Sequence, residues 1–292
     1  MRNNREMLEL VRGVAEKDGR VRAVVMNGSR ANPNAPKDIF QDFDIVYIVN
    51  QIDTFINDDD WIDIFGERLM LQLPEAKTKA LLPPENNGAF VYLMLFKDGN
   101  RIDLTLMPLE KMDELLANDS STIVLLDKDG LLPHFDEPSD KDYWEKRPTE
   151  NMYDECCNEF WWVLQNTAKG IWRDELPYAK RMFTYSRDML DQMLCWYIGS
   201  RHDFKIAAGK MGKYFKRYLE DDLWTLYYRT YSDGDYDHFW EAIFAACELF
   251  RTVGKRVSEY FHYSYNDEED TNMSRYLKQV GELPKDAENL IL

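Results

Sequence analysis

The chain has 292 residues, of which 45% are hydrophobic and 14% aromatic, so we expect a globular protein with room for two domains. Its formal net charge of −17 argues against a DNA or RNA substrate, because phosphate backbones attract basic surfaces. An acidic surface is compatible with plain solubility and also with attraction of a cationic substrate, and charge alone does not separate the two.

The sequence shows no apolar run near the ~20 residues that a membrane-spanning helix needs. Residues 1–20 have the spacing of an amphipathic helix and lack the apolar stretch of a signal peptide. The cysteines have neither zinc-site nor disulfide-framework spacing: Cys156, Cys157, Cys195 and Cys247. We therefore expect a reduced, cytoplasmic protein with no membrane partner.

The first half alternates short apolar runs with polar segments, which predicts a mixed sheet flanked by helices. We expect strands at 21–26, 45–49, 68–73, 90–96, 101–107 and 123–126. An Asp-Gly pair predicts a hairpin turn between the fourth and fifth strands. Short helical pieces are expected from residue 61 and over 109–117.

The second half has a different pattern, with long aromatic-rich segments of helical spacing. We expect helices at 151–171, 178–198, 210–231 and 237–260, which together predict a helical bundle. A charged, proline-containing stretch before them is typical of a linker. We therefore predict an α+β protein divided into a sheet domain at 1–137, a linker at 138–150, a helical domain at 151–265 and a polar tail at 266–292.

The stretch from 21 to 49 contains the chemistry around which the rest is organised. A buried strand leads into Gly28-Ser29, and a polar spacer then leads through Asp42-Phe43-Asp44 into a second strand. Asp42 and Asp44 share one face of that strand, and two carboxylates there are costly unless a positive charge lies between them. A divalent metal suits carboxylate oxygens, and Gly28 and Ser29 with the following amides suit an anion.

A third acid, Asp103, lies inside the apolar strand expected at 101–107 and needs a partner there. One interpretation is an ion pair with Arg101, two residues away on the same face. The other is a third metal ligand beside Asp42 and Asp44, which could also accept the proton of an attacking hydroxyl group.

The order of strand, Gly-Ser, polar spacer, Asp-x-Asp and strand resembles the DNA polymerase beta-like nucleotidyltransferase superfamily, although Asn27 stands where that pattern usually has an apolar residue. In the superfamily a third carboxylate on a later strand completes the metal site, and Asp103 is the matching position. The segment YDECCNEFWWVLQNTAKGIWRDELPYAKRM, with QDFDIVY and AGKMGKYFKRYL, is more specific and resembles the aminoglycoside 6-adenylyltransferases that act on streptomycin. The resemblance runs over nearly the whole chain. It implies a nucleotidyltransferase domain followed by a helical domain, with ATP and an aminoglycoside between them.

The helical domain offers acidic and aromatic groups that suit a polycationic sugar, through charge pairs and cation–π contacts. These candidate substrate-binding residues are Asp154, Glu155, Glu159, Trp161 and Trp162. The alternative is that the tryptophans are core residues and the acids form a solvated face. A basic group could neutralise the terminal phosphates of ATP: Lys169, Lys210, Lys213, Lys216 and Arg217. Of these, Lys210, Lys213 and Arg217 would share one helix face. The alternative for this group is a solvated amphipathic helix.

The sequence thus predicts Mg²⁺-dependent transfer of AMP from ATP to an aminoglycoside hydroxyl, with release of pyrophosphate. Asp42, Asp44 and Asp103 would hold the metal, and Gly28, Ser29 and Arg30 the terminal phosphates. Two alternatives remain open: a nucleotidyltransferase with another small-molecule acceptor, and a non-catalytic nucleotide-binding relative. The chain would act as a monomer or a homodimer, without nucleic acid.

Overall fold

The computed structural model describes residues 1–58, 60–76, 88–112 and 120–290. The chain divides into two units, Met1–Asp142 and Tyr143–Leu292. The division falls inside the segment 138–150 that the sequence suggests as a linker. The helix predicted at 109–117 lies partly outside the described residues, and its described beginning is the 3-10 turn η2 (Leu109–Lys111).

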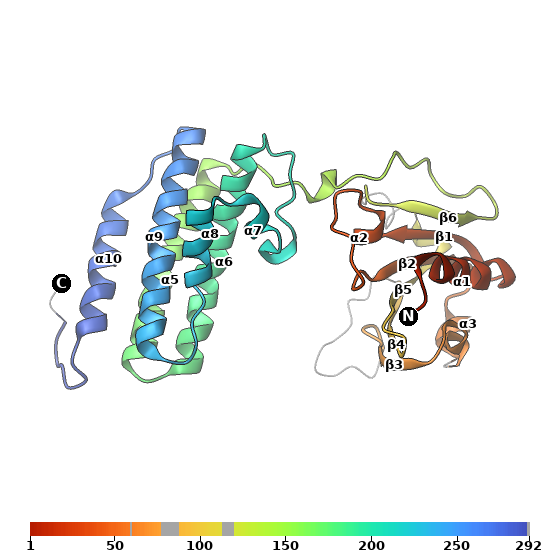
Figure 1. Cartoon of the computed structure of the whole chain (residues 1–292), viewed down its shortest axis with the longest axis horizontal. Coiled ribbons are helices and arrows are strands. Elements are labelled where there is room, and N and C mark those ends of the chain that lie inside the picture. The colour runs from red at the N-terminus through yellow and green to blue at the C-terminus, as the bar shows by residue number, and fades with distance from the viewer. Residues whose placement is uncertain (59, 77–87, 113–119, 291–292) are drawn as a thin grey trace. The chain divides into compact units, whose positions relative to one another are not determined.

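The first unit is built on a mixed sheet, as predicted (Figure 1). Its described strands are β1 (Val21–Asn27), β2 (Phe43–Val49), β3 (Arg68–Gln72), β4 (Phe90–Phe96), β5 (Arg101–Pro108) and β6 (Ile123–Asp127). They lie in the order β3-β4-β5-β2-β1-β6. The central pair β2 and β5 is parallel, whereas the other pairs are antiparallel. The α+β class expected from the sequence is therefore confirmed.

Alternation of side chains along the central strands gives the sheet two apolar faces. Helix α1 (Asn4–Lys17) covers one face (Figure 1). There the hydroxyl group of the buried Tyr47 donates to the carbonyl of Val11. The opposite face carries a smaller cluster, which includes Val25 and Ile48. The other helical elements in the described residues of this unit are short: α2 (Gly28–Ala31), α3 (Asp53–Ile56) and η1 (Trp61–Phe65). The 3-10 turn η3 (Lys141–Tyr143) spans the division between the units. The central strands are thus buried on both faces, which fixes the positions of the groups at their ends.

The second unit is a helical bundle around α5 (Glu150–Trp172), α6 (Leu176–Arg201) and α9 (Tyr236–Phe261). Each begins and ends within one to three residues of its predicted bounds. Their core is aromatic, with Phe160 and Phe250 stacked at a centroid distance of 3.8 Å. None of the helices in the described ranges is both long enough and apolar enough to cross a bilayer.

Two sequence-based expectations for this unit were wrong. The polar tail expected from residue 266 contains a further helix, α10 (Asp267–Glu282), whose Leu277 and Val280 are buried in the bundle core. The single helix expected at 210–231 is three short ones, η4 (Lys210–Gly212), α7 (Phe215–Tyr218) and α8 (Asp221–Arg229). Positive φ angles at Met211 and Gly212 interrupt the helical path.

Candidate active site

Strand register brings the predicted carboxylates together. In the parallel pair of β2 and β5, Asp44 lies directly opposite Asp103. On the other side of β2, Asp44 pairs with Asn27, the last residue of β1. Asp42 comes immediately before β2, so three acids lie at one end of two neighbouring strands. All three were predicted from the sequence, and the parallel pairing explains why they meet.

Gly28 allows the chain to pass close to these acids. Its φ is +73°, a region that side chains disfavour, and a Cβ atom there would lie 2.8 Å from Cγ of Asp44. Any other residue would therefore displace the carboxylate or the turn. This close approach is the role that the sequence predicts for the glycine.

Arg101 supplies the positive charge that the acids require. Its Nε and Nη2 atoms donate to the two oxygens of Asp103, both at 2.7 Å. Its Nη1 atom lies 3.4 Å from Oδ2 of Asp42. The ion pair between Arg101 and Asp103 considered from the sequence is therefore present, and the same guanidinium group reaches a second acid.

The environment of Asp42 disfavours its charged form. Burial raises the pKa of Asp42 above its ordinary value, and the negative charge of Asp103 acts in the same direction. The cations Arg101 and Arg30 oppose this rise. A further positive charge at this place would stabilise the ionised carboxylates.

Ser29 and Arg30 lie on α2, immediately after Gly28. Arg30 donates from Nε to the carbonyl of Asp42 at 3.0 Å and from Nη2 to that of Gln41 at 2.7 Å, while its guanidinium group lies over the ring of Phe43. These contacts of Arg30 fix the segment that leads into β2. Contact with phosphate would be an additional role of Arg30. The Ser29 hydroxyl accepts a hydrogen bond from Nε2 of Gln41 at 3.3 Å. Gln41 was not predicted from the sequence, because nothing in its spacing marks it.

The carboxylate set suits a magnesium ion, which prefers oxygen ligands. Within the described residues, however, no three His, Cys, Asp or Glu side chains are gathered as a finished metal site. Arg101 explains this arrangement, because it draws Asp42 and Asp103 onto its own guanidinium group. Asp42, Asp44 and Asp103 fit the ion in donor chemistry and in strand position, provided that Arg101 withdraws.

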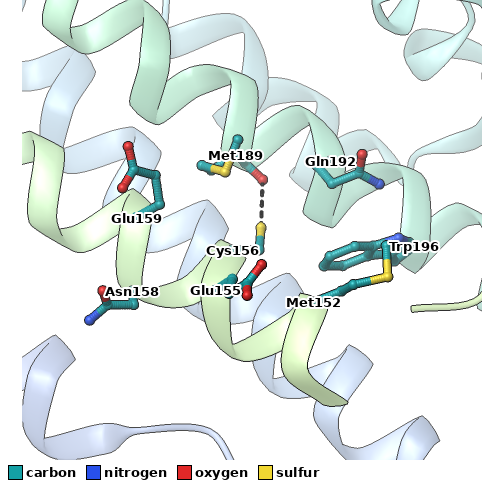
Figure 2. Close-up of a pocket in the computed structure, with 8 residues that line it drawn as sticks. All are labelled: Met152, Glu155, Cys156, Asn158, Glu159, Met189, Gln192 and Trp196. Atoms are coloured by element: carbon teal, nitrogen blue, oxygen red, sulfur yellow. Dashed lines mark hydrogen bonds between the residues drawn. The ribbon is translucent and has the colours of Figure 1, made fainter. Parts of the chain in front are cut away.

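In the helical unit, an open groove of about 490 Å³ runs between α5 and α6 (Figure 2). Glu155 and Glu159 lie along it from α5, and Gln192 and Trp196 face them from α6 (Figure 2). Two of the five predicted substrate-binding residues therefore share one groove with an aromatic ring. That ring belongs to Trp196, which was not predicted from the sequence; it lines the groove with the 3% of its surface that the core leaves exposed.

The other three predicted residues do not line this groove. The assignment of Trp161 to substrate is wrong for this structure: its side chain is only 2% exposed and belongs to the bundle core. Trp162 is 62% exposed, and Asp154 is exposed on the same helix. Helical geometry separates adjacent tryptophans by about 100°, so one can be buried while the next faces solvent.

The predicted basic group is also divided. Lys210 and Lys213 lie after α6, where the amide of Ala208 donates to Glu145, just before α5 begins. Lys169 lies in the last turn of α5, twenty residues after Thr149, which is the N-cap of that helix. At 1.5 Å per residue, this is roughly 30 Å. Because 210–231 is not one helix, the shared face expected for Lys210, Lys213 and Arg217 was wrong as well.

Comparison with known proteins adds an independent result. The chain matches the family described as streptomycin adenylyltransferase over residues 1–280. Two relatives named aminoglycoside 6-adenylyltransferase come from Bacillus subtilis (strain 168) and Campylobacter jejuni. The first is 39% identical over 282 residues, covering 96% of this chain and 98% of its own. The second is 42% identical over 266 residues, covering 91% of each. The crystal structure of an aminoglycoside 6-adenyltransferase from Bacillus subtilis is 36% identical, with coverage of 96% of this chain and 99% of that chain and a TM-score of 0.47.

Proposed function

The chain belongs to the streptomycin adenylyltransferase family and is a nucleotidyltransferase, and from this premise we propose that it transfers AMP from ATP to the 6-hydroxyl group of a streptomycin-type aminoglycoside. The observation that supports the chemistry best is the pairing of Asp44 with Asp103 in parallel register, with Asp42 beside them. A protein that only bound a nucleotide would gain nothing from three acids placed at the adjoining ends of two strands.

In the proposed reaction, the acceptor oxygen forms a bond to the α-phosphorus of ATP, and the bond from that phosphorus to the β-phosphate oxygen breaks. Pyrophosphate leaves, and Asp103 accepts the hydroxyl proton. Asp42, Asp44 and Asp103 would hold Mg²⁺, which would supply charge neutralisation and a lower hydroxyl pKa. Arg101 would compete with the proton and the metal for Asp103, because its two hydrogen bonds engage one lone pair on each carboxylate oxygen.

The remaining assignments follow from charge. Gly28, Ser29 and Arg30 are proposed to approach the terminal phosphates, with Lys210 and Lys213 as further cations. The acids Glu155 and Glu159 are proposed to attract the cationic acceptor into the groove of Figure 2. Location in the cytoplasm, where ATP is available, belongs to the same proposal.

The test is pyrophosphate release with ATP and Mg²⁺, with and without streptomycin. We expect release to require the drug and to fall by about 100-fold or more in Asp42→Asn, since loss of one charge-stabilising group has an effect of that order. Asp38→Asn is the matched control: it lies in the same loop, and its carboxylate accepts only the amide of Phe40 among described partners. Near-normal activity of Asp44→Asn would contradict the metal assignment. Release with another antibiotic but not with streptomycin would move the proposal to that acceptor.

A further inference from the structure

A second cavity of about 420 Å³ lies on the other side of α6 from the groove of Figure 2, with Gln192 contributing to both. Its walls are α6, from Thr184 to Cys195, the segment 209–215 and the ring of Tyr231. Two carboxylates on α6, Asp188 and Asp191, line it. Neither was predicted from the sequence, although an acid inside the aromatic-rich segment 178–198 is the kind of signal that identified Asp103.

One carboxylate oxygen of Asp191 is not satisfied by its surroundings. Its Oδ1 atom is buried and has no hydrogen-bond partner among the residues that the structure describes. Burial raises the pKa of Asp191 to about 6, although a hydrogen bond from Tyr227 and the charge of Arg187 oppose the rise. A buried carboxylate oxygen without a partner is unfavourable, so a hydrogen-bond donor from a ligand would stabilise this atom.

Arg187 is the only cationic side chain among the described residues that line the cavity, and one cation stands against two acids. Its guanidinium group stacks on the ring of Tyr231, 3.7 Å from the centroid, and Nη2 lies 3.5 Å from the Tyr227 hydroxyl. No ion pair between Arg187 and either acid is found in the described part of the chain. The cavity therefore keeps an excess of negative charge.

The opposite wall is formed by strained backbone. Met211 has a φ of 56°, unusual for a residue with a side chain, and is 88% exposed. The next residue, Gly212, has a φ of +71°, which glycine adopts without strain, and a Cβ atom there would lie 2.6 Å from the ring of Phe215. Such strain persists where surrounding structure enforces it, and it frequently accompanies ligand binding. A long apolar side chain at the rim of an acidic cavity suits a ligand with both cationic and apolar parts.

We propose that this cavity binds a guanidinium or ammonium group of the aminoglycoside acceptor, with Asp191 and Asp188 as its charge partners. The proposal rests on the proposed function and assigns it a second subsite beyond Glu155 and Glu159. A cationic N–H group supplies both the charge and the donor that Oδ1 of Asp191 lacks. Lys210 and Lys213 are on the segment that forms the opposite wall, so the subsite adjoins the cations proposed for ATP.

The first measurement is calorimetric titration of the full chain with streptomycin and with streptidine, its part that carries two guanidinium groups. We expect about tenfold weaker binding in Asp191→Asn and about threefold in Asp188→Asn, because one charged contact is lost in each. Glu248→Gln, which removes an exposed charge on α9 away from the cavity, is the matched control and should bind like the wild type.

Thermal unfolding separates a ligand-binding role from a structural one. Because Asp191 is poorly satisfied, Asp191→Asn should unfold at the same temperature as the wild type or higher. Unchanged drug binding in Asp191→Asn overturns the proposal. If Asp191→Asn fails to fold, the same titration is made with Asp188→Asn, whose side chain is exposed. Unchanged drug binding in Asp188→Asn then overturns the proposal.

The pH dependence gives a further check. Drug binding should weaken as the pH falls through about 6, where Asp191 becomes protonated. The titratable and charged groups that act on it come from α6, α8 and the residues after α8: Arg187, Asp188, Cys195, Tyr227 and Tyr231. The dependence of drug affinity on pH near 6 should disappear in Asp191→Asn. The same dependence in that variant and in the wild type contradicts the assignment.

Failure of this inference and failure of the proposed function are distinguishable. If the wild type turns over streptomycin and both variants bind it unchanged, only the assignment of the cavity as a subsite is overturned. Absence of wild-type turnover with every aminoglycoside overturns the proposed function. Agmatine, a small dication with one guanidinium group, then tests the cavity: binding to the wild type and not to Asp191→Asn supports it, and equal binding or none overturns it.

Discussion

A single methyl group at Gly28 would collide with the carboxylate of Asp44, and this tests the active site at the scale of one residue. Gly28→Ala adds that methyl group at a φ of +73°, where a side chain is also strained. We expect adenylyl transfer to fall by at least about 100-fold, because a displaced metal ligand loses its stabilisation of charge in the transition state. Drug-dependent pyrophosphate release measures the loss, and circular dichroism checks that the sheet remains.

Gly13→Ala is the control for this substitution. Gly13 lies inside α1, has an ordinary φ, and a Cβ atom added to it would meet no heavy atom within 4 Å. Alanine there should stabilise the helix by about 0.5–1 kcal/mol and leave activity unchanged. Equal activity of the two variants would show that Asp44 tolerates displacement and would weaken its assignment as a ligand.

Individual site residues could be selected from the sequence where one residue type has one physical reason. Asp42, Asp44 and Asp103 could be selected because acids beside or inside apolar strands need a partner. Their meeting depends on the parallel pairing of β2 and β5, which joins residues some sixty positions apart and leaves no local signal. Trp161 could not be separated from Trp162 by type, because only the direction of each side chain in the bundle decides which is buried.

At the scale of elements, the long helices were predictable because their apolar spacing runs over five turns or more. Helix α10 was missed because it begins with four acids, Asp267 to Asp270, which obscure the apolar spacing that follows. Acids in a first turn favour a helix, since they interact with the positive end of its dipole. The break at 209–212 had a signal in Gly209 and Gly212, but the left-handed backbone of Met211 between them has none.

The contribution of α10 is tested through its one buried acid. Asp270 is 3% exposed and accepts hydrogen bonds from Arg251 of α9, Tyr265 and Ser274. Asp270→Asn should lower the free energy of unfolding by about 2–3 kcal/mol, because Arg251 is left partly buried without its counter-charge. Chemical denaturation followed by tryptophan fluorescence measures the change.

Asp267→Asn provides the contrast on the same helix. Asp267 pairs with Lys255, but its side chain is 70% exposed, so the pair is largely screened by solvent. Its loss should cost less than about 1 kcal/mol. If the two variants were equally stable, α10 would be a loosely attached element, closer to the tail expected from the sequence.

For the whole molecule, charge is the property that no single element explains. The chain has 53 acidic and 36 basic side chains, and the net charge of −17 extends over its length. The sequence alone left two meanings open, solubility and attraction of a cationic substrate. The groove and the cavity beside α6 favour the second, because acids line both: Glu155 and Glu159 in one, Asp188 and Asp191 in the other.

If the acidic surface attracts the acceptor, higher ionic strength should weaken the capture of the drug and should not weaken that of the nucleotide. The Debye length falls from about 30 Å at 0.01 M salt to about 8 Å at 0.15 M, so distant acids are felt only at low salt. We expect kcat/KM for streptomycin to fall several-fold across this range at fixed Mg²⁺ and saturating ATP. The KM for ATP, an anion that the same field repels, should stay constant or decrease. If kcat/KM for the drug were independent of salt, the net charge would serve solubility and not the attraction of the acceptor.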